Sequence, residues 1–145
     1  LDIDGVLNGH QFDEVAQSCS IDRKCVENLN RILFSVECEI VVSSSWRYTV
    51  HGGAMTPIGF QYMLRTHGMR DSTPVRDITA TDEEIAIRGE QIRSWRRHHA
   101  RGCHYVVLDD MDLGISERGL NFVQTNGAIG LTEGDADRAI SFLVN

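Results

Sequence analysis

The 145-residue chain has the length of one compact domain, and its 41% hydrophobic residues are enough to form a core. A net charge of −7 argues against non-specific attraction to nucleic acids or anionic membranes. No apolar run approaches the roughly 20 residues that span a bilayer, and no secretory signal is recognisable. The four cysteines lack the spacings of zinc sites and redox motifs, so we expect reduced thiols and a cytoplasmic protein.

Strands and helices are expected to alternate along the chain. Residues 1–4 are typical of the end of a buried strand, and we expect further strand residues to precede Leu1. Apolar residues at helical spacing predict helices over 22–36, 81–100 and 132–143. The first has Ser20 or Asp22 as its N-cap, and the second is expected to break at Gly89. Short β-branched or apolar runs predict strands over 39–42, 105–108 and 121–124. This alternation predicts an α/β fold with a mainly parallel sheet and helices on both faces.

The middle of the chain has the least regular pattern. Residues 48–80 contain both prolines, Pro57 and Pro74, and the sequence shows neither internal repeats nor low-complexity linkers. We therefore expect a single domain over residues 1–145, with 48–80 as a small insertion.

Polar side chains follow three of the predicted strands. Asp2 and Asp4 end the first, residues 43–45 follow the second, and Asp109 and Asp110 end the third. Ligands of open α/β sheets bind outside the carboxyl ends of the strands, so these residues are expected to meet in one crevice. Several carboxylates held together need a hard cation, and Mg²⁺ prefers such oxygens with waters and substrate phosphate. The pattern predicts a phosphate-handling magnesium site.

Three segments resemble a known enzyme superfamily. L-D-I-D-G-V-L-N at 1–8 resembles motif I of the haloacid dehalogenase (HAD) phosphatases, V-V-S-S-S-W-R at 41–47 resembles motif II, and V-V-L-D-D at 106–110 resembles motif IV. The first two are similar to the compact HAD domains of multi-part RNA-repair proteins. The resemblance implies a Rossmann-like three-layer sandwich with a minimal cap or none.

The resemblance also implies roles for the residues of motifs I and II. Asp2 would be the nucleophile that forms an aspartyl-phosphate, and Asp4 would be the general acid and base whose backbone carbonyl reaches the metal. Gly5 would let the backbone turn sharply beside the substrate. Ser43 would bind the phosphoryl group, with Ser44 as the substitute if the strand ends one residue later.

The resemblance also implies a cation, usually a lysine, in a motif III ahead of motif IV, but no lysine follows Lys24. Arg88 is our candidate, and Arg47 is the alternative contact to the phosphate. Asp109 would be the third metal ligand after Asp2 and Asp4, with Asp110 as an additional or alternative one. We expect Trp46 to pack in the core rather than to stack on a base.

These observations favour a Mg²⁺-dependent phosphomonoesterase that acts on a phosphorylated substrate, with nucleic-acid ends suggested by the resemblance. One alternative is a phosphatase for small nucleotides, with residues 48–80 as a partial lid. Another is a non-catalytic module that binds metal or phosphate. The presence of both Asp2 and Asp4 favours an enzyme, because binding alone does not need an acid-base carboxylate. Neither a membrane partner nor a particular oligomeric state is indicated.

Overall fold

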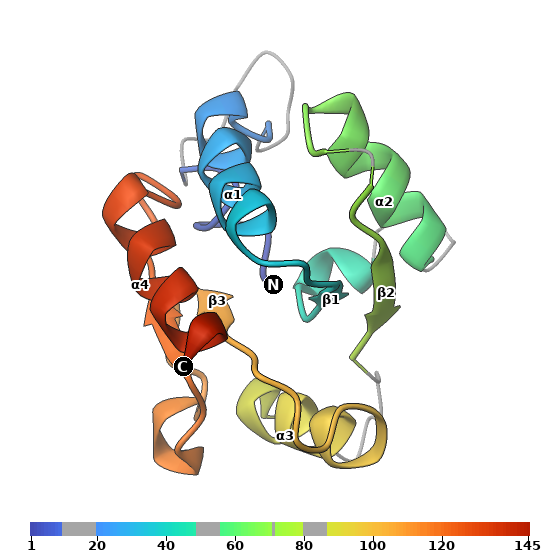
Figure 1. Cartoon of the computed structure of the whole chain (residues 1–145), viewed down its shortest axis with the longest axis vertical. Helices are drawn as coiled ribbons and strands as arrows, with labels where there is room; N and C mark the ends of the chain where they lie inside the picture. Colours follow the sequence, from blue (N-terminus) through green and yellow to red (C-terminus); the bar gives the residue numbers. More distant parts are fainter. Residues whose placement is uncertain (10–19, 49–55, 71, 80–86) are drawn as a thin grey trace.

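The computed structural model describes residues 1–9, 20–48, 56–70, 72–79 and 87–145, and of Arg47 and Tyr48 the backbone alone (Figure 1). Its helices are α1 Arg23–Ser35, α2 Pro57–Thr66, α3 Arg88–His99 and α4 Glu133–Val144, with 3-10 turns at Ser45–Tyr48 (η1) and Ser116–Arg118 (η2). Its strands are β1 Ile40–Val42, β2 Val75–Ile78, β3 Val107–Asp109 and β4 Phe122–Gln124. None of these helices is long and apolar enough to cross a membrane.

The four strands form two parallel pairs. β1 pairs with β2, with a shift of register between Ile40 and Val41. β3 pairs with β4 in a regular register that places Val107 beside Phe122. Parallel pairs connected through helices are the signature of an α/β protein, so the predicted fold class is confirmed.

The first two residues connect the two pairs. On one side, the nitrogen of Leu1 donates to the carbonyl of Val41 at 2.8 Å, and Ser43 N–H donates to the carbonyl of Leu1 at 2.9 Å. On the other side, Asp2 N–H donates to the carbonyl of Leu108 at 2.9 Å. Residues 1 and 2 therefore lie between β1 and β3, with β2 and β4 outside them.

Local signals explain where the helices begin. Asp22 caps α1 by accepting a hydrogen bond from Lys24 N–H, as one of the two expected caps. Thr132 and Asp135 form a reciprocal capping box at the start of α4. The helix expected from residue 81 begins at Arg88, and residues 80–86 lie outside the described part of the chain. Ile87, the N-cap of α3, has extended dihedrals, so the helix begins one residue before Gly89, the position where the break was expected.

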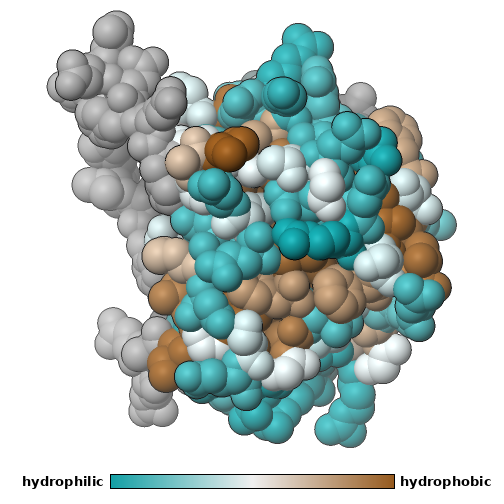
Figure 2. Space-filling model, turned by 90° about the vertical axis from the view of Figure 1, so that its left-hand side faces the viewer, coloured by the Kyte–Doolittle hydropathy of each residue, from teal (hydrophilic) through white to brown (hydrophobic). Residues whose placement is uncertain are grey.

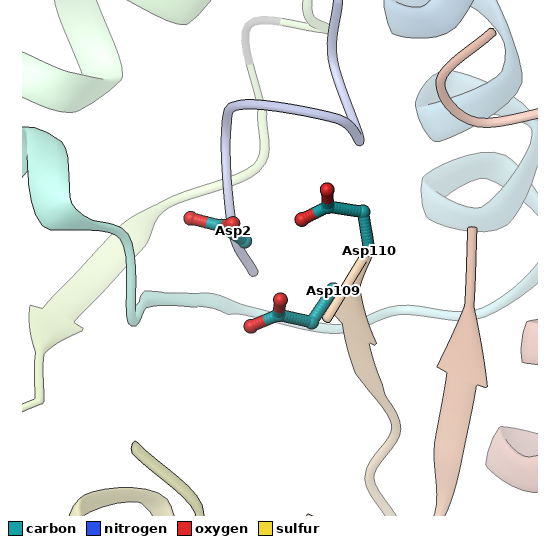
Figure 3. Close-up of side chains that lie close together, drawn as sticks. All are labelled: Asp2, Asp109 and Asp110. Carbon is teal, nitrogen blue, oxygen red and sulfur yellow. The ribbon is translucent and has the colours of Figure 1, made fainter. Parts of the chain in front are cut away.

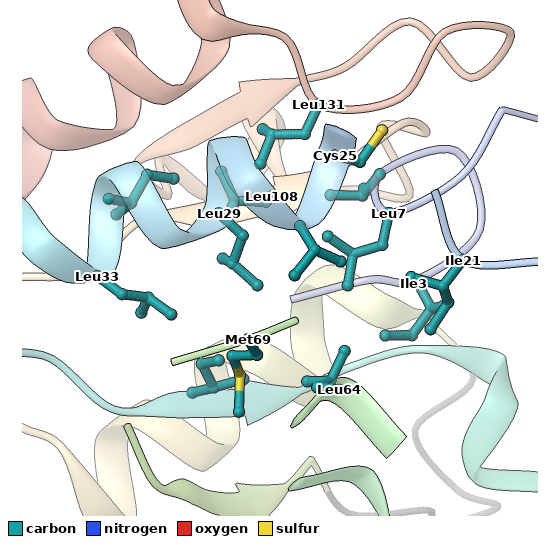
Figure 4. Close-up of a cluster of buried hydrophobic side chains, with 14 of the residues drawn as sticks. Ile3, Leu7, Ile21, Cys25, Leu29, Leu33, Leu64, Met69, Leu108 and Leu131 are labelled. Atoms are coloured by element: carbon teal, nitrogen blue, oxygen red, sulfur yellow. The ribbon is translucent and has the colours of Figure 1, made fainter. Parts of the chain in front are cut away.

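The main core lies between α1, α4 and the strands (Figure 4). α1 and α4 pack against each other, and α2 packs on β2. Fully buried side chains come from the first turn of the chain, from α1, α2 and α4, and from the strands, among them Ile3, Leu7, Val26, Val42, Phe60, Leu64, Val123 and Ala136. This packing fixes the first residues of the chain from both sides.

The surface on the α4 side of the molecule mixes hydrophilic side chains with small apolar areas (Figure 2). Exposed apolar groups of this kind are normal for a folded domain. Within the stretch 48–80, which we expected to be an insertion, the structure places α2 and β2. Neither element is indicated by the apolar pattern.

Candidate active site

Three carboxylates gather where the first residues of the chain meet the end of β3 (Figure 3). Asp2, Asp109 and Asp110 each offer an oxygen, and these atoms all lie within 4.8 Å of one another. Asp2 is 3% exposed and Asp109 is fully buried. The acids meet because Asp2 and the end of β3 are neighbours in the hydrogen-bonded array, as the position of the strand ends predicted.

Arg88, at the first position of α3, lies against two of these acids. Its Nη1 is 2.7 Å from Oδ2 of Asp109 and 3.0 Å from Oδ2 of Asp2, and its side chain is only 10% exposed. Burial disfavours the charged guanidinium, but Asp109 and Asp2 outweigh this effect and raise the pKa of Arg88. The structure therefore places Arg88, the candidate cation, at the acidic cluster.

Burial also acts on the acids. It raises the pKa of Asp109, an effect that Arg88 opposes and the charge of Asp2 strengthens, and the pKa ends above its ordinary value. Oδ1 of Asp2 is buried and has no hydrogen-bond partner among the residues that the structure describes. A buried carboxylate oxygen without a donor is unfavourable unless a cation or a ligand meets it. The cluster thus fits a hard divalent cation, which takes oxygen ligands of this kind.

Asp4 lies outside this group of three acids, and its carboxylate is held by other side chains. Nδ2 of Asn8 donates to Oδ1 of Asp4 at 3.0 Å, and Nε1 of Trp46 donates to Oδ2 at 2.7 Å. Trp46 packs against the core as expected, but it also makes this hydrogen bond, which the expectation of packing alone had missed. Both oxygens of Asp4 therefore have a fixed neighbour.

Gly5 allows the turn after Asp4 to approach Asp110. Its φ of +72° lies in the left-handed region, and a Cβ built on it would overlap with the carboxylate of Asp110. The carbonyl of Gly5 accepts a hydrogen bond from Oγ1 of Thr125 at 2.6 Å, and its N–H donates to Oδ1 of Asn8 at 2.9 Å. The sharp turn expected at Gly5 is confirmed.

The serines after β1 are buried near the same end of the sheet. Ser43 is 1% exposed, and its N–H donates to the carbonyl of Leu1 beside Asp2. Ser44 is fully buried, and its Oγ accepts a hydrogen bond from Trp46 N–H at 3.2 Å, which anchors the start of η1. Arg47 lies in η1, but its side chain is outside the described part of the structure.

A comparison with family models gives a match over residues 1–136, to the HAD domain in Swiss Army Knife RNA repair proteins. The chain belongs to this HAD family. The match covers every segment that contributes to the acidic cluster, and it suggests a HAD-type phosphatase linked to RNA repair. Neither the curated proteins nor the solved structures include a significant match.

α3 of this HAD domain is held close to the loop after β3. Gly89 N–H donates to the carbonyl of Leu113 at 3.0 Å, and a Cβ on Gly89 would overlap with the carbonyl of Gly114. Because Arg88 is the preceding residue, this close approach fixes the guanidinium beside Asp109. Only glycine permits such a contact between a helix and a neighbouring backbone.

The HAD domain also contains a cavity of about 970 Å³, which is distinct from the acidic cluster. Residues 37–41 and 103–108, which lead into β1 and β3, line much of it, together with Leu1 and parts of α1 and α3. Neither the three clustered acids nor Arg88 is among its lining residues. Charged side chains such as Glu39, Arg76 and Arg96 line part of this cavity, but the three acids that could hold a cation together lie elsewhere, so the candidate site is the cluster itself.

Proposed function

We propose that this HAD domain is a Mg²⁺-dependent phosphomonoesterase that forms an aspartyl-phosphate on Asp2. The observation that carries the proposal is the buried carboxylate of Asp2, which has one oxygen without a partner among the described residues and the other paired with Arg88. A module that only binds a metal could also use this oxygen, but it would not need Asp4, the second carboxylate that is proposed as acid and base. A nucleophile must keep a lone pair free for the phosphorus.

In the proposed reaction, the carboxylate of Asp2 attacks the phosphorus of the ester. The bond from phosphorus to the ester oxygen breaks, and Asp4 gives its proton to the departing oxygen. Asp4 then takes a proton from a water molecule that attacks the aspartyl-phosphate, and inorganic phosphate leaves. Arg88 and Ser43 stabilise the charge that develops on the phosphoryl oxygens.

Asp2, Asp109 and Asp110 would hold the Mg²⁺ ion, with the backbone carbonyl of Asp4 as a further ligand. When bound, the ion neutralises negative charge on the acids and on the phosphoryl group, which lets a carboxylate approach a dianionic phosphate. Ser44 and Arg47 complete the proposed phosphate contacts.

We also propose the finer features of the fold. Residues 1 and 2 connect the strand pairs into one sheet, which supports a Rossmann-like three-layer sandwich within a single domain over residues 1–145. Without a full cap domain the site would be open to a large substrate. The family of RNA-repair proteins supports a terminal phosphate of a nucleic acid as that substrate. A cytoplasmic location stays a prediction from the cysteine pattern.

The first test is the hydrolysis of an aryl phosphate with and without Mg²⁺, with Asp2→Asn as control. We expect turnover that requires the metal and is abolished in the variant, whose fold is checked by circular dichroism. An active Asp2→Asn protein would contradict the nucleophile. Metal binding without turnover on any phosphate ester would favour the non-catalytic module instead.

The second test compares a 3′-phosphorylated oligonucleotide with the matching nucleoside 3′-monophosphate, which share the same ester bond. A higher kcat/KM on the oligonucleotide would support nucleic-acid ends as the substrate. Equal values, or a preference for the mononucleotide, would support the small-nucleotide phosphatase.

A further inference from the structure

The proposed acid-base residue, Asp4, is held by two side chains to which no role has yet been given. Nε1 of Trp46 lies 2.7 Å from Oδ2 of Asp4, and Nδ2 of Asn8 lies 3.0 Å from Oδ1. Both neighbours are hydrogen-bond donors at these atoms. We propose that Trp46 is a positioning residue: with Asn8, it fixes the orientation of the Asp4 carboxylate. This inference rests on the proposed function.

The two donors fix the direction of the Asp4 carboxylate. An indole N–H and an amide NH₂ can only donate, so each holds one carboxylate oxygen in place. A general acid or base works best when its carboxylate has a defined direction relative to the reacting atoms.

The orientation of Asn8 follows from the same network. Its Oδ1 accepts a hydrogen bond from Gly5 N–H at 2.9 Å, so its NH₂ group must be the end that faces Asp4. Asn8 is 1% exposed, so the amide cannot turn away into solvent. Asn8 thereby connects the turn at Gly5 to the carboxylate.

Trp46 reaches Asp4 from a distant part of the chain. It lies in η1, directly after the serines that follow β1, and its backbone N–H donates to Oγ of Ser44 at 3.2 Å. Its ring packs against the core, which leaves the indole little freedom to move. A packed ring with a fixed N–H is a rigid support for a carboxylate.

The chain offers a matched control for this hydrogen bond. Trp95, the only other tryptophan in the sequence, donates its Nε1–H to Oδ2 of Asp77, also at 2.7 Å. Asp77 lies on β2 and is not one of the three clustered acids. Trp46→Phe and Trp95→Phe therefore remove the same group and keep an aromatic ring, but only the first touches the proposed catalytic machinery.

The kinetic test measures both variants on phosphate esters with good and poor leaving groups. For Trp46→Phe we expect kcat to fall about tenfold on poor leaving groups, as part of the roughly 10²–10⁴-fold effect of general acid–base catalysis. Little change is expected on good leaving groups, and none for Trp95→Phe. In an Asp4→Ala background, Trp46→Phe should cause no further loss. Equal losses for all leaving groups, or a further loss without Asp4, would overturn the inference.

A second readout does not depend on activity. The two tryptophans give two indole N–H signals in a ¹H–¹⁵N spectrum, which the Phe variants assign. We expect Asp4→Ala to shift the Trp46 signal and Asp77→Ala to shift the Trp95 signal.

An unmoved Trp46 signal in Asp4→Ala, in a variant that has lost turnover, would overturn the inference alone. A shifted signal with full turnover on poor leaving groups would overturn the acid role of Asp4 and this inference, while the phosphomonoesterase activity with Asp2 as nucleophile would stand.

Discussion

Nη1 of Arg88 lies 2.7 Å from Oδ2 of Asp109 and 3.0 Å from Oδ2 of Asp2, so one cation serves two buried carboxylates. With Asp110, the cluster holds three acids. If all are ionised, three negative charges and one positive charge leave a surplus of two negative charges. One divalent cation balances this surplus, which is why stability and metal binding are expected to be coupled here.

Replacing Arg88 should expose this coupling. Arg88→Met leaves buried acids without their cation, and breaking a buried ion pair in this way costs about 3–5 kcal/mol. We expect this loss in the free energy of unfolding in EDTA, measured by urea denaturation, and a partial recovery in Mg²⁺. The control is Arg118→Met, because Arg118 pairs with Glu90 at 2.9 Å away from the cluster. A Mg²⁺ effect of the same size in both variants would contradict the coupling.

The raised pKa of Asp109 predicts a pH dependence of stability in the absence of metal. The folded state binds the proton of Asp109 more tightly than the unfolded state, where the pKa is near 3.8. The stabilising contribution is therefore complete below that value and is lost as the pH rises through the raised pKa. In EDTA, the stability of Asp109→Asn relative to the wild type should increase with pH over this window.

Asp112 provides a control of opposite sign. The N–H of Ser116 donates to its carboxylate and lowers the pKa of Asp112. Its contribution is present above the unfolded pKa and is lost as the pH falls through the lowered one. Asp112→Asn should therefore lose stability relative to the wild type as the pH rises. Parallel pH profiles for the two variants would show that the acids of the cluster do not behave as proposed.

Gly5→Ala should damage the metal site more than the fold. The positive φ of Gly5 makes alanine unfavourable by about 1–2 kcal/mol, and the new methyl group displaces the Asp110 carboxylate. Gly102→Ala shares the backbone penalty, since its φ is +81°, but no atom lies within 4 Å of its Cβ. Titration calorimetry should show weaker Mg²⁺ binding for Gly5→Ala only. Equal affinities would remove Asp110 from the proposed ligands.

Gly89→Ala tests the contact that places Arg88. In an exposed helix, alanine in place of glycine adds about 0.5–1 kcal/mol of stability, and we expect such a gain for Gly134→Ala in α4. At Gly89 the methyl group collides with the carbonyl of Gly114, so both thermal stability and kcat should fall. A stabilised and fully active Gly89→Ala protein would show that α3 can shift without moving Arg88.

The strand ends were the most informative part of the sequence. Asp2 and Asp109 could be placed together because parallel strands deliver their last residues to one edge, a rule that needs no knowledge of side-chain contacts. Arg88 could be suggested because the resemblance to HAD phosphatases implies a cation ahead of motif IV and no lysine follows Lys24. The first inference depends on the topology of the sheet, and the second depends on the family resemblance.

Other features depend on local signals that were misread. Thr56 caps α2 and Pro57 occupies its first turn, both typical of a helix start, but Pro57 was interpreted as a mark of irregular structure. β2 has the sequence V-R-D-I, which is too short and too polar to be distinguished from a loop. The bond from Trp46 to Asp4 joins residues 42 positions apart, and no periodicity in the sequence encodes such a contact.

The position of Asp2 between β1 and β3 also has a consequence for synthesis on the ribosome. Asp2 is translated long before Leu108, whose carbonyl accepts the hydrogen bond from the backbone N–H of Asp2. Contacts between distant residues form slowly, because the intervening chain must first be ordered. A nascent chain arrested before β3 would therefore lack both Asp109 and the support for Asp2, so the acidic cluster could form only after β3 has been translated.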